Sequence, residues 1–260
     1  MISASDSSAS AGMQVDLRVL SDLGAPARCV ITAVTVQGDG GAKSINPVDP
    51  EVIVDSIDTA LSDFPGIGAV KVGLLGDEPT AAALKKPLSR IYELGIPIIV
   101  DPVMKSTPGS ALSIGDTSRA IFQNVLPWTT LFTPNRDELE TLSLLVDAGE
   151  VDESAKVSRL MESGAGDILV TGGDTDEDQC MDILYEKNGT NTDFTHPRIG
   201  NKTPRGTGCS LSTAIAVHLS RGMSMGEAVG WSIDYVTGLI ERADMVGKQL
   251  LLLPGKNRDW

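Results

Sequence analysis

The sequence predicts an α/β fold in which a mainly parallel central sheet lies between two layers of helices. Short runs of β-branched and apolar residues alternate with amphipathic segments, which is the order of consecutive βαβ units. The runs are apolar almost throughout, as expected for strands covered on both faces. The 27 glycines and 14 prolines supply the many turns that this alternation needs. Lys187-Asn188-Gly189-Thr190 contains the Asn-Gly pair typical of tight turns and predicts an antiparallel hairpin at one edge of the sheet.

The elements follow from these patterns in chain order. Strands are expected at residues 29–37, 68–73, 96–101, 130–133 and 167–171, and the two hairpin strands at 180–186 and 191–197. Helices are expected at residues 48–62, 79–94, 135–163 (as two helices), 208–221 and 225–242. The interior shows no repeat, no low-complexity linker and no change of composition, so residues 1–260 are expected to form a single domain.

Composition excludes several classes of protein. With 41% hydrophobic residues, the chain can bury a sizeable core and is not globally disordered. The 21 basic and 35 acidic residues give a formal charge of −14, which argues against a binder of nucleic acid or anionic membranes. No apolar run reaches the roughly 18 residues of a membrane span. The start of the chain lacks the pattern of a secretory signal, and the three cysteines form no CxxC pair, so a cytoplasmic location is expected.

The most informative motif is Gly206-Thr207-Gly208-Cys209, which opens the helix expected at 208–221. Its glycines permit positive φ and a close backbone approach, and the free N–H groups of a helix start point at one spot. Such a turn binds an anion, typically a phosphate. Cys209 would feel the helix dipole, which favours the thiolate. The motif alone leaves a second interpretation open, a Gly-rich helix start with a buried core cysteine.

The same motif, with Pro197-Arg198-Ile199 upstream, resembles the hydroxymethylpyrimidine/phosphomethylpyrimidine kinases of thiamine biosynthesis, a family within the ribokinase-like superfamily. Further landmarks of that family recur in the expected order along nearly the whole chain: Ile2 to Asp16, which resembles its first loop, Lys71-Val72-Gly73-Leu74-Leu75, Asp101-Pro102-Val103-Met104, and Thr133-Pro134-Asn135 through Glu138. The resemblance implies a ribokinase-like three-layer α/β/α fold. It also implies phosphoryl transfer from ATP, with Mg²⁺, to 4-amino-5-hydroxymethyl-2-methylpyrimidine or its monophosphate, by a homodimer.

The resemblance also assigns roles to residues. The anion-binding turn Gly206, Thr207 and Gly208 would hold the transferring phosphoryl group, with Cys209 as the base. The metal ion would be held by Glu138, through water, and by Asp101. Nucleotide-binding residues would be Asn135, Thr171, Gly172, Gly173 and Lys202. The pyrimidine pocket would be formed by Gln37, Asp16, Ala11, Gly12, Leu74 and Val103.

The residues themselves support part of this assignment. Asp101 ends an apolar strand, where the ligands of open α/β sheets gather. Asn135 and Glu138 would share one face at a helix start, although the same pair also suits an ordinary helix start. The Gln37 amide can donate to and accept from a pyrimidine ring, or be a polar strand end. Thr171-Gly172-Gly173 would equally suit a plain turn after a strand.

The first loop departs from the family pattern. Ala4, Ala9 and Ser10 stand where the family has glycines, and Ser7 stands in place of a proline. Any of these residues held at positive φ would be strained by about 1–2 kcal/mol. The departures leave two alternatives open, a pyridoxal-type kinase and a non-catalytic pyrimidine-binding protein on the same fold.

Overall fold

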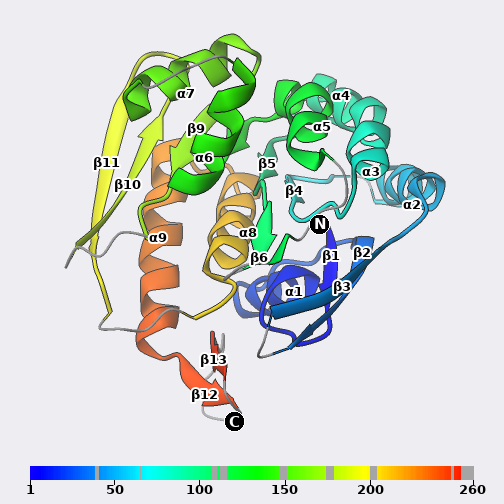
Figure 1. Ribbon diagram of the computed structural model, residues 1–260, viewed down its shortest axis with the longest axis horizontal. Helices are drawn as coiled ribbons and strands as arrows, with labels where there is room; N and C mark the ends of the chain where they lie inside the picture. The colour runs from blue at the N-terminus through cyan, green and yellow to red at the C-terminus, as the bar shows by residue number, and fades with distance from the viewer. Residues whose placement is uncertain are drawn as a thin grey trace.

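A nine-stranded sheet forms the centre of the molecule (Figure 1). The computed structural model describes residues 1–38, 41–64, 66–106, 110–111, 116–146, 151–173, 179–199, 204–246 and 249–252. The strand order is β11-β10-β9-β8-β5-β4-β1-β2-β3. The six strands from β9 to β2 in this order pair in parallel, and antiparallel strands lie at both ends.

The bounds of the elements are as follows. The strands are β1 (Ile2–Asp6), β2 (Val30–Gly38), β3 (Gly41–Pro47), β4 (Val70–Val72), β5 (Ile98–Val100), β6 (Lys105–Ser106), β7 (Ser110–Ala111), β8 (Leu131–Phe132), β9 (Asp167–Val170), β10 (Gln179–Tyr185), β11 (Asn191–Pro197), β12 (Asp244–Val246) and β13 (Gln249–Leu251). The helices are α1 (Gly12–Asp22), α2 (Pro50–Asp63), α3 (Glu78–Ala83), α4 (Lys85–Glu93), α5 (Thr117–Asn124), α6 (Arg136–Ser143), α7 (Glu153–Glu162), α8 (Thr207–Ser220) and α9 (Met225–Glu241), with 3-10 turns at Leu126–Trp128 and Leu144–Val146.

Two helical layers cover the sheet, as the alternation of side chains along β5 illustrates. Ile98 and Val100 belong to the core cluster that also contains buried residues of α2 to α7. Ile99, which points to the opposite face, packs in the cluster of α8 and α9. The predicted three-layer α/β/α architecture is therefore confirmed. In the part of the chain that the structure describes, no helix is long and apolar enough to cross a membrane.

The predicted hairpin is confirmed, but the sheet has a second antiparallel edge. β10 and β11 pair antiparallel around a turn in which Gly189 has φ +89°. At the other end of the sheet, β3 pairs antiparallel with β2, an antiparallel pair that the sequence analysis did not identify. β3 has few apolar residues, most of its side chains are partly or fully exposed, and it is the last strand at that end of the sheet. Its sequence therefore lacks the apolar run by which the other strands were recognised.

Two other predictions are corrected. The helix expected at 79–94 is two helices, α3 and α4, because Pro87 has no N–H to donate to the carbonyl four residues earlier. The segment interpreted as the first loop, residues 2–16, contains the central strand β1 and the start of α1. Ile2 pairs in parallel with both Val30 and Val72, so β1 lies inside the sheet.

Candidate active site

The predicted site residues that the structure describes lie at or near the carboxyl ends of the parallel strands, at one end of the sheet. Asp101 directly follows β5, Leu74 lies just after β4 and Thr171 directly follows β9. In open α/β sheets, ligands bind in the crevice outside the carboxyl ends of the strands. β5 lies between β8 and β4 in the sheet. Asp101, after β5, is therefore at the centre of the site, with the ends of β4, β1 and β2 on one side and the ends of β8 and β9 on the other.

Residues Gly206–Cys209, here called the anion loop, begin α8. Gly206 has φ +85°, and a Cβ on it would lie 2.5 Å from the carbonyl oxygen of Ser10. Only glycine fits this conformation and this close approach. The Ser210 N–H donates to the Gly206 carbonyl at 2.8 Å, so the helical hydrogen bonds start immediately after the loop. The N–H groups of the first turn therefore point outward together, which is the geometry of an anion site at a helix N-terminus.

Asp101 lies beneath the anion loop. A Cβ on Gly208 would lie 3.7 Å from Asp101 Oδ2, and the Ser212 hydroxyl donates to the same oxygen at 3.4 Å. The side chain is buried, and burial raises the pKa of the Asp101 carboxyl, although the nearby Lys71 acts in the opposite direction. The loop and this carboxylate thus form the centre of the site.

At Cys209, burial acts against the helix dipole that the sequence indicated would favour the thiolate. Burial raises the pKa of Cys209 to about 12, and the charges of Asp101 and Asp16 add to this shift. Lys71 and the Gly12 N–H favour the thiolate but do not compensate for the loss of water. The side chain packs with Val15, Val19 and Ala214 in a small apolar cluster. Desolvation therefore outweighs the helix dipole at this position.

Lys71 is a functional candidate that sequence reasoning missed. It lies in the middle of β4, is 0% exposed, and its ammonium group is 3.0 Å from both carboxylate oxygens of Asp16. Thr213 of α8 donates its hydroxyl to Asp16 Oδ1 at 2.9 Å. A lysine inside an apolar strand was the available signal, because a buried lysine needs a partner. The Asp16 carboxylate is itself 0% exposed. Its place in the pyrimidine pocket stays a prediction, in which Asp16 would act through packing or through its backbone.

The other residues predicted for the pyrimidine lie on one side of Asp101. Leu74 packs in a small cluster with Ala4 and Ala33, and Val103 contacts the same cluster. Gln37 is held beside the first loop, because the Ser7 hydroxyl accepts from its N–H at 2.9 Å and donates to its carbonyl at 3.0 Å. The structure thus brings residues from β1, β2 and β4 and the segment after β5 together.

The loop from β1 to α1 is organised by Asp6, which sequence reasoning did not single out. Its buried carboxylate accepts hydrogen bonds from the N–H groups of Ser8, Ser10 and Ala11 at 2.9 to 3.1 Å. Gly12, with φ +61°, begins α1, and a Cβ there would lie 2.5 Å from the Ala4 carbonyl oxygen. The predicted residues Ala11 and Gly12 are therefore held in place by backbone contacts.

Ala9 is strained, whereas the other two residues that replace family glycines are not. Among the described residues, Ala9 is the non-glycine residue with positive φ, at +55°. Arg18 donates a hydrogen bond to its carbonyl and so helps to hold this conformation. The strain expected from the sequence is thus confirmed at Ala9 and absent at Ala4 and Ser10.

Substituting Ala9→Gly is expected to stabilise the protein. Glycine relieves the strain of the left-handed conformation, which stabilises the folded state by about 1–2 kcal/mol. Its greater conformational freedom stabilises the unfolded chain by about 0.5–1 kcal/mol. The free energy of unfolding in urea should therefore rise by about 0.5–1 kcal/mol. Ala27→Gly, at an exposed residue of ordinary φ, is the matched control and should lower stability. A loss of stability in Ala9→Gly equal to that of the control would contradict the strain.

The residues predicted for the nucleotide lie on the other side of Asp101. Asn135 and Glu138 form a capping box at the start of α6: the Asn135 side chain accepts from the Glu138 N–H at 2.8 Å, and Glu138 accepts from the Asn135 N–H at 3.0 Å. The Thr171 N–H donates to the Pro134 carbonyl at 3.0 Å, which joins the ends of β8 and β9. Asn135 and Glu138 therefore cap α6, which is the structural alternative that the sequence left open. Their position next to the ends of β8 and β9 also suits the predicted roles in binding the nucleotide and the metal ion.

Glycine at position 172 is required by packing. A Cβ there would lie 2.1 Å from the Met181 carbonyl oxygen, and the Gly172 N–H donates to Asp182 Oδ1 at 2.7 Å. Gly173 has open space around it, and its carbonyl accepts from Arg198 at 3.2 Å. Lys202, the remaining residue predicted for the nucleotide, lies outside the described residues.

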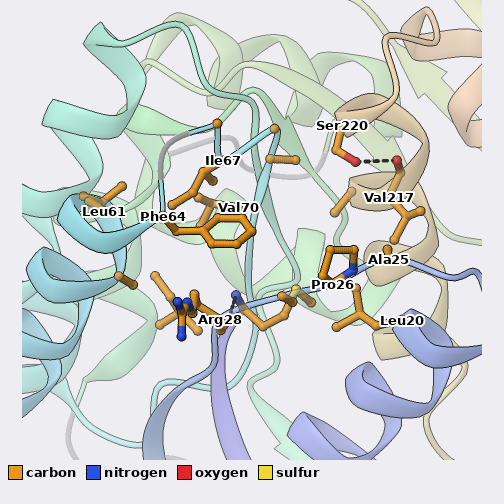
Figure 2. A pocket seen from close by; sticks show the side chains of 18 of the residues that line it. Leu20, Ala25, Pro26, Arg28, Leu61, Phe64, Ile67, Val70, Val217 and Ser220 are labelled. Atoms are coloured by element: carbon orange, nitrogen blue, oxygen red, sulfur yellow. Dashed lines mark hydrogen bonds between the residues drawn. The ribbon is translucent and has the colours of Figure 1, made fainter.

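A cavity of about 360 Å³ lies at the opposite end of the sheet, where strands β2 and β4 begin (Figure 2). Its walls include Val30 and Val70, which begin β2 and β4, together with Phe64 after α2 and Val217 near the end of α8. The described residues that line it are mostly apolar and include no carboxylate and none of the predicted site residues. The candidate active site is therefore placed at the carboxyl ends of the parallel strands, where Asp101 and the anion loop lie.

Comparison with known proteins identifies the family of the chain. Residues 6–253 match the family model described as phosphomethylpyrimidine kinase. The chain is 34% identical over 244 residues to a hydroxymethylpyrimidine/phosphomethylpyrimidine kinase of Rhizobium meliloti, covering 94% of this chain and 90% of the relative. A phosphomethylpyrimidine kinase structure from Clostridium difficile has a TM-score of 0.76 at 27% identity, over 92% of this chain and 97% of the other. The Staphylococcus aureus pyridoxal kinase in complex with AMP-PCP has a TM-score of 0.83 at 28% identity, over 99% and 93%.

Proposed function

Since the chain belongs to the phosphomethylpyrimidine kinase family, we propose that it phosphorylates 4-amino-5-hydroxymethyl-2-methylpyrimidine, its monophosphate, or both, with ATP, in thiamine biosynthesis. The observation that carries the proposal is the anion loop above Asp101, between the two groups of predicted binding residues. A pyrimidine on the side of Gln37, Leu74 and Val103 and a nucleotide on the side of Asn135 and Thr171 would meet at this loop.

The proposed catalysis is mainly positioning and charge stabilisation. The transition state of phosphoryl transfer is loose, with negative charge spread over the equatorial oxygens. Outward-pointing N–H groups of the anion loop would stabilise that charge without reorganising. Because Gly206 packs against Ser10 of the first loop, the loop that would hold the phosphoryl group and the loop that would lie beside the pyrimidine are in contact.

Magnesium fits the donors that this edge offers. Carboxylate oxygens are the ligands that Mg²⁺ prefers, and the ion keeps several waters and binds one or two carboxylates together with substrate phosphates. Among the described residues there is no group of three or more His, Cys, Asp or Glu side chains that could hold a metal alone. We propose that Asp101 and, through water, Glu138 hold the ion, which when bound would neutralise phosphate charge.

Cys209 is proposed to act as a neutral thiol that lines the anion loop, not as the base first expected. Because its pKa is raised to about 12, a thiolate base would make kcat rise about tenfold per pH unit between pH 6 and 9. We expect a kcat that is flat over this range, and a Cys209→Ala variant with the same flat profile and a loss of less than about tenfold, since the loose transition state needs little help from a base. A slope of one in the wild type that disappears in Cys209→Ala would restore the base role.

The test of the proposed function is a substrate panel. Purified protein is incubated with Mg·ATP and, separately, the hydroxymethylpyrimidine, its monophosphate and pyridoxal, and phosphorylated products are quantified by mass spectrometry. The proposal expects product from at least one pyrimidine. The structural similarity to a pyridoxal kinase favours pyridoxal as the second candidate substrate, and product from pyridoxal alone would replace the proposal. Pyrimidine binding with no product from any substrate would favour the non-catalytic binder. The expected homodimer and cytoplasmic location stay predictions.

A further inference from the structure

We propose that Lys71 is a positioning residue for phosphoryl transfer: its ammonium group, anchored on Asp16, holds Asp101 and the first turns of α8 in the arrangement that the anion loop needs. The inference rests on the proposed function and adds to it a residue that touches neither the pyrimidine nor the nucleotide. It is carried by the burial of Lys71, by its contacts and by the charges around it.

The first step is the ion pair. Lys71 Nζ is 3.0 Å from Asp16 Oδ1 and Oδ2, and both side chains are 0% exposed. The Thr213 hydroxyl donates to Asp16 Oδ1 at 2.9 Å, one turn after Cys209 in α8. The pair therefore ties β4 and α1 to the start of the helix that carries the anion loop.

The second step is the space that the fold leaves for the ammonium group. A Cβ on Gly73 would lie 2.8 Å from Lys71 Nζ and 2.7 Å from the hydroxyl of Ser3. Glycine at this position thus makes room for the lysine head group beneath the site. A methyl group there would displace the ammonium without removing its charge.

The third step is electrostatic. Burial alone would lower the pKa of Lys71, but the carboxylates of Asp16 and Asp101 raise it above its ordinary value. Lys71 is therefore a cation that contacts the Asp16 carboxylate directly and attracts the second buried carboxylate, Asp101, through its charge. Without it, Asp16 and Asp101 would place two uncompensated negative charges beneath a loop that must receive phosphate oxygens.

A purely structural role makes a different prediction from a positioning role. If Lys71 only neutralised Asp16, removing both charges together would restore the enzyme, because a buried ion pair can often be replaced by neutral groups of similar volume. If Lys71 also holds Asp101 in place, the double variant would recover stability and not kcat.

The experiment compares Lys71→Met, the double variant Lys71→Met/Asp16→Asn, Gly73→Ala and a control, Leu160→Ala, which removes a fully buried side chain of α7. Melting temperature, kcat and the KM of the pyrimidine are measured for each and for the wild type. We expect Lys71→Met to lower the melting temperature and kcat. The double variant should recover most of the melting temperature while kcat stays at least about tenfold below the wild type and KM changes less than about threefold.

Gly73→Ala keeps the test decisive where Lys71→Met does not fold. It should lower kcat at least about fivefold with a smaller loss of melting temperature than Leu160→Ala, whereas Leu160→Ala should keep kcat within about twofold. A double variant with kcat within about twofold of the wild type, or an unaffected Gly73→Ala, would overturn the proposal. Failure of the proposed function would show in the wild type alone, as the absence of phosphorylated pyrimidine.

Discussion

Gly206→Ala is expected to reduce kcat by about 10²- to 10³-fold, the loss that follows removal of a preorganised donor from an anion site. The reason is steric. The added Cβ would lie 2.5 Å from the Ser10 carbonyl oxygen at a φ of +85°, so the loop must move away from the first loop and its N–H groups no longer converge. Steady-state kinetics with saturating Mg·ATP and pyrimidine measure the effect.

Gly222→Ala is the matched control at the other end of the same helix. Gly222 has φ +83°, and no atom lies within 4 Å of the position of its Cβ. Both variants should lose about 1–2 kcal/mol of stability from the left-handed conformation, and only Gly206→Ala should lose activity. A Gly206→Ala enzyme that keeps more than about a tenth of kcat would show that the anion loop does not hold the transferring group.

Asp101→Asn is expected to lower kcat by about 100-fold or more and, at the same time, to stabilise the protein at neutral pH. The activity falls because the substitution removes the charge that the proposal uses for the metal ion. Stability rises because burial disfavours the ionised carboxylate and raises the pKa of Asp101 in the folded state. Above that pKa, the wild type carries a buried charge that destabilises it relative to the asparagine variant.

The pH dependence fixes the sign of this prediction. As the pH falls through the raised pKa of Asp101, the carboxylate of the folded wild type binds a proton, and the stability difference between wild type and Asp101→Asn disappears. The difference in melting temperature between Asp101→Asn and wild type should therefore be positive at pH 7.5 and vanish near pH 4. Circular dichroism melts at both values measure it. A variant that is less stable at pH 7.5 and equal at pH 4 would mean that Lys71 stabilises the carboxylate more than burial destabilises it.

The sequence was sufficient for the central part of the fold because its strands are continuous apolar runs. Ile98, Ile99 and Val100 show the reason: successive residues of β5 face opposite helical layers, and each must be apolar. β3 lacks this pattern because it is an edge strand, and it was missed. The break between α3 and α4 could have been predicted from Pro87, whose missing N–H interrupts the helix.

The candidate site was only partly predictable. The glycine-rich start of α8 was found because glycines at a helix start have a local meaning, and Gly206 has the positive φ, +85°, that the sequence suggested. The burial of Cys209, which raises its pKa, could not be predicted, since the residues that bury it and act on it, Val15, Lys71 and Asp101, come from distant parts of the chain. The same holds for the ion pair of Lys71 with Asp16, which are 55 residues apart in sequence.

The central claim is that a phosphoryl group is transferred to a pyrimidine at the site above Asp101. The stoichiometry of the reaction tests this claim most directly. ADP and phosphorylated pyrimidine are quantified together for the wild type and for Gly206→Ala. The proposal predicts one ADP for each phosphoryl group found on the pyrimidine, and neither product at a comparable rate in Gly206→Ala. ADP released without phosphorylated pyrimidine, or equal product from both proteins, would contradict it.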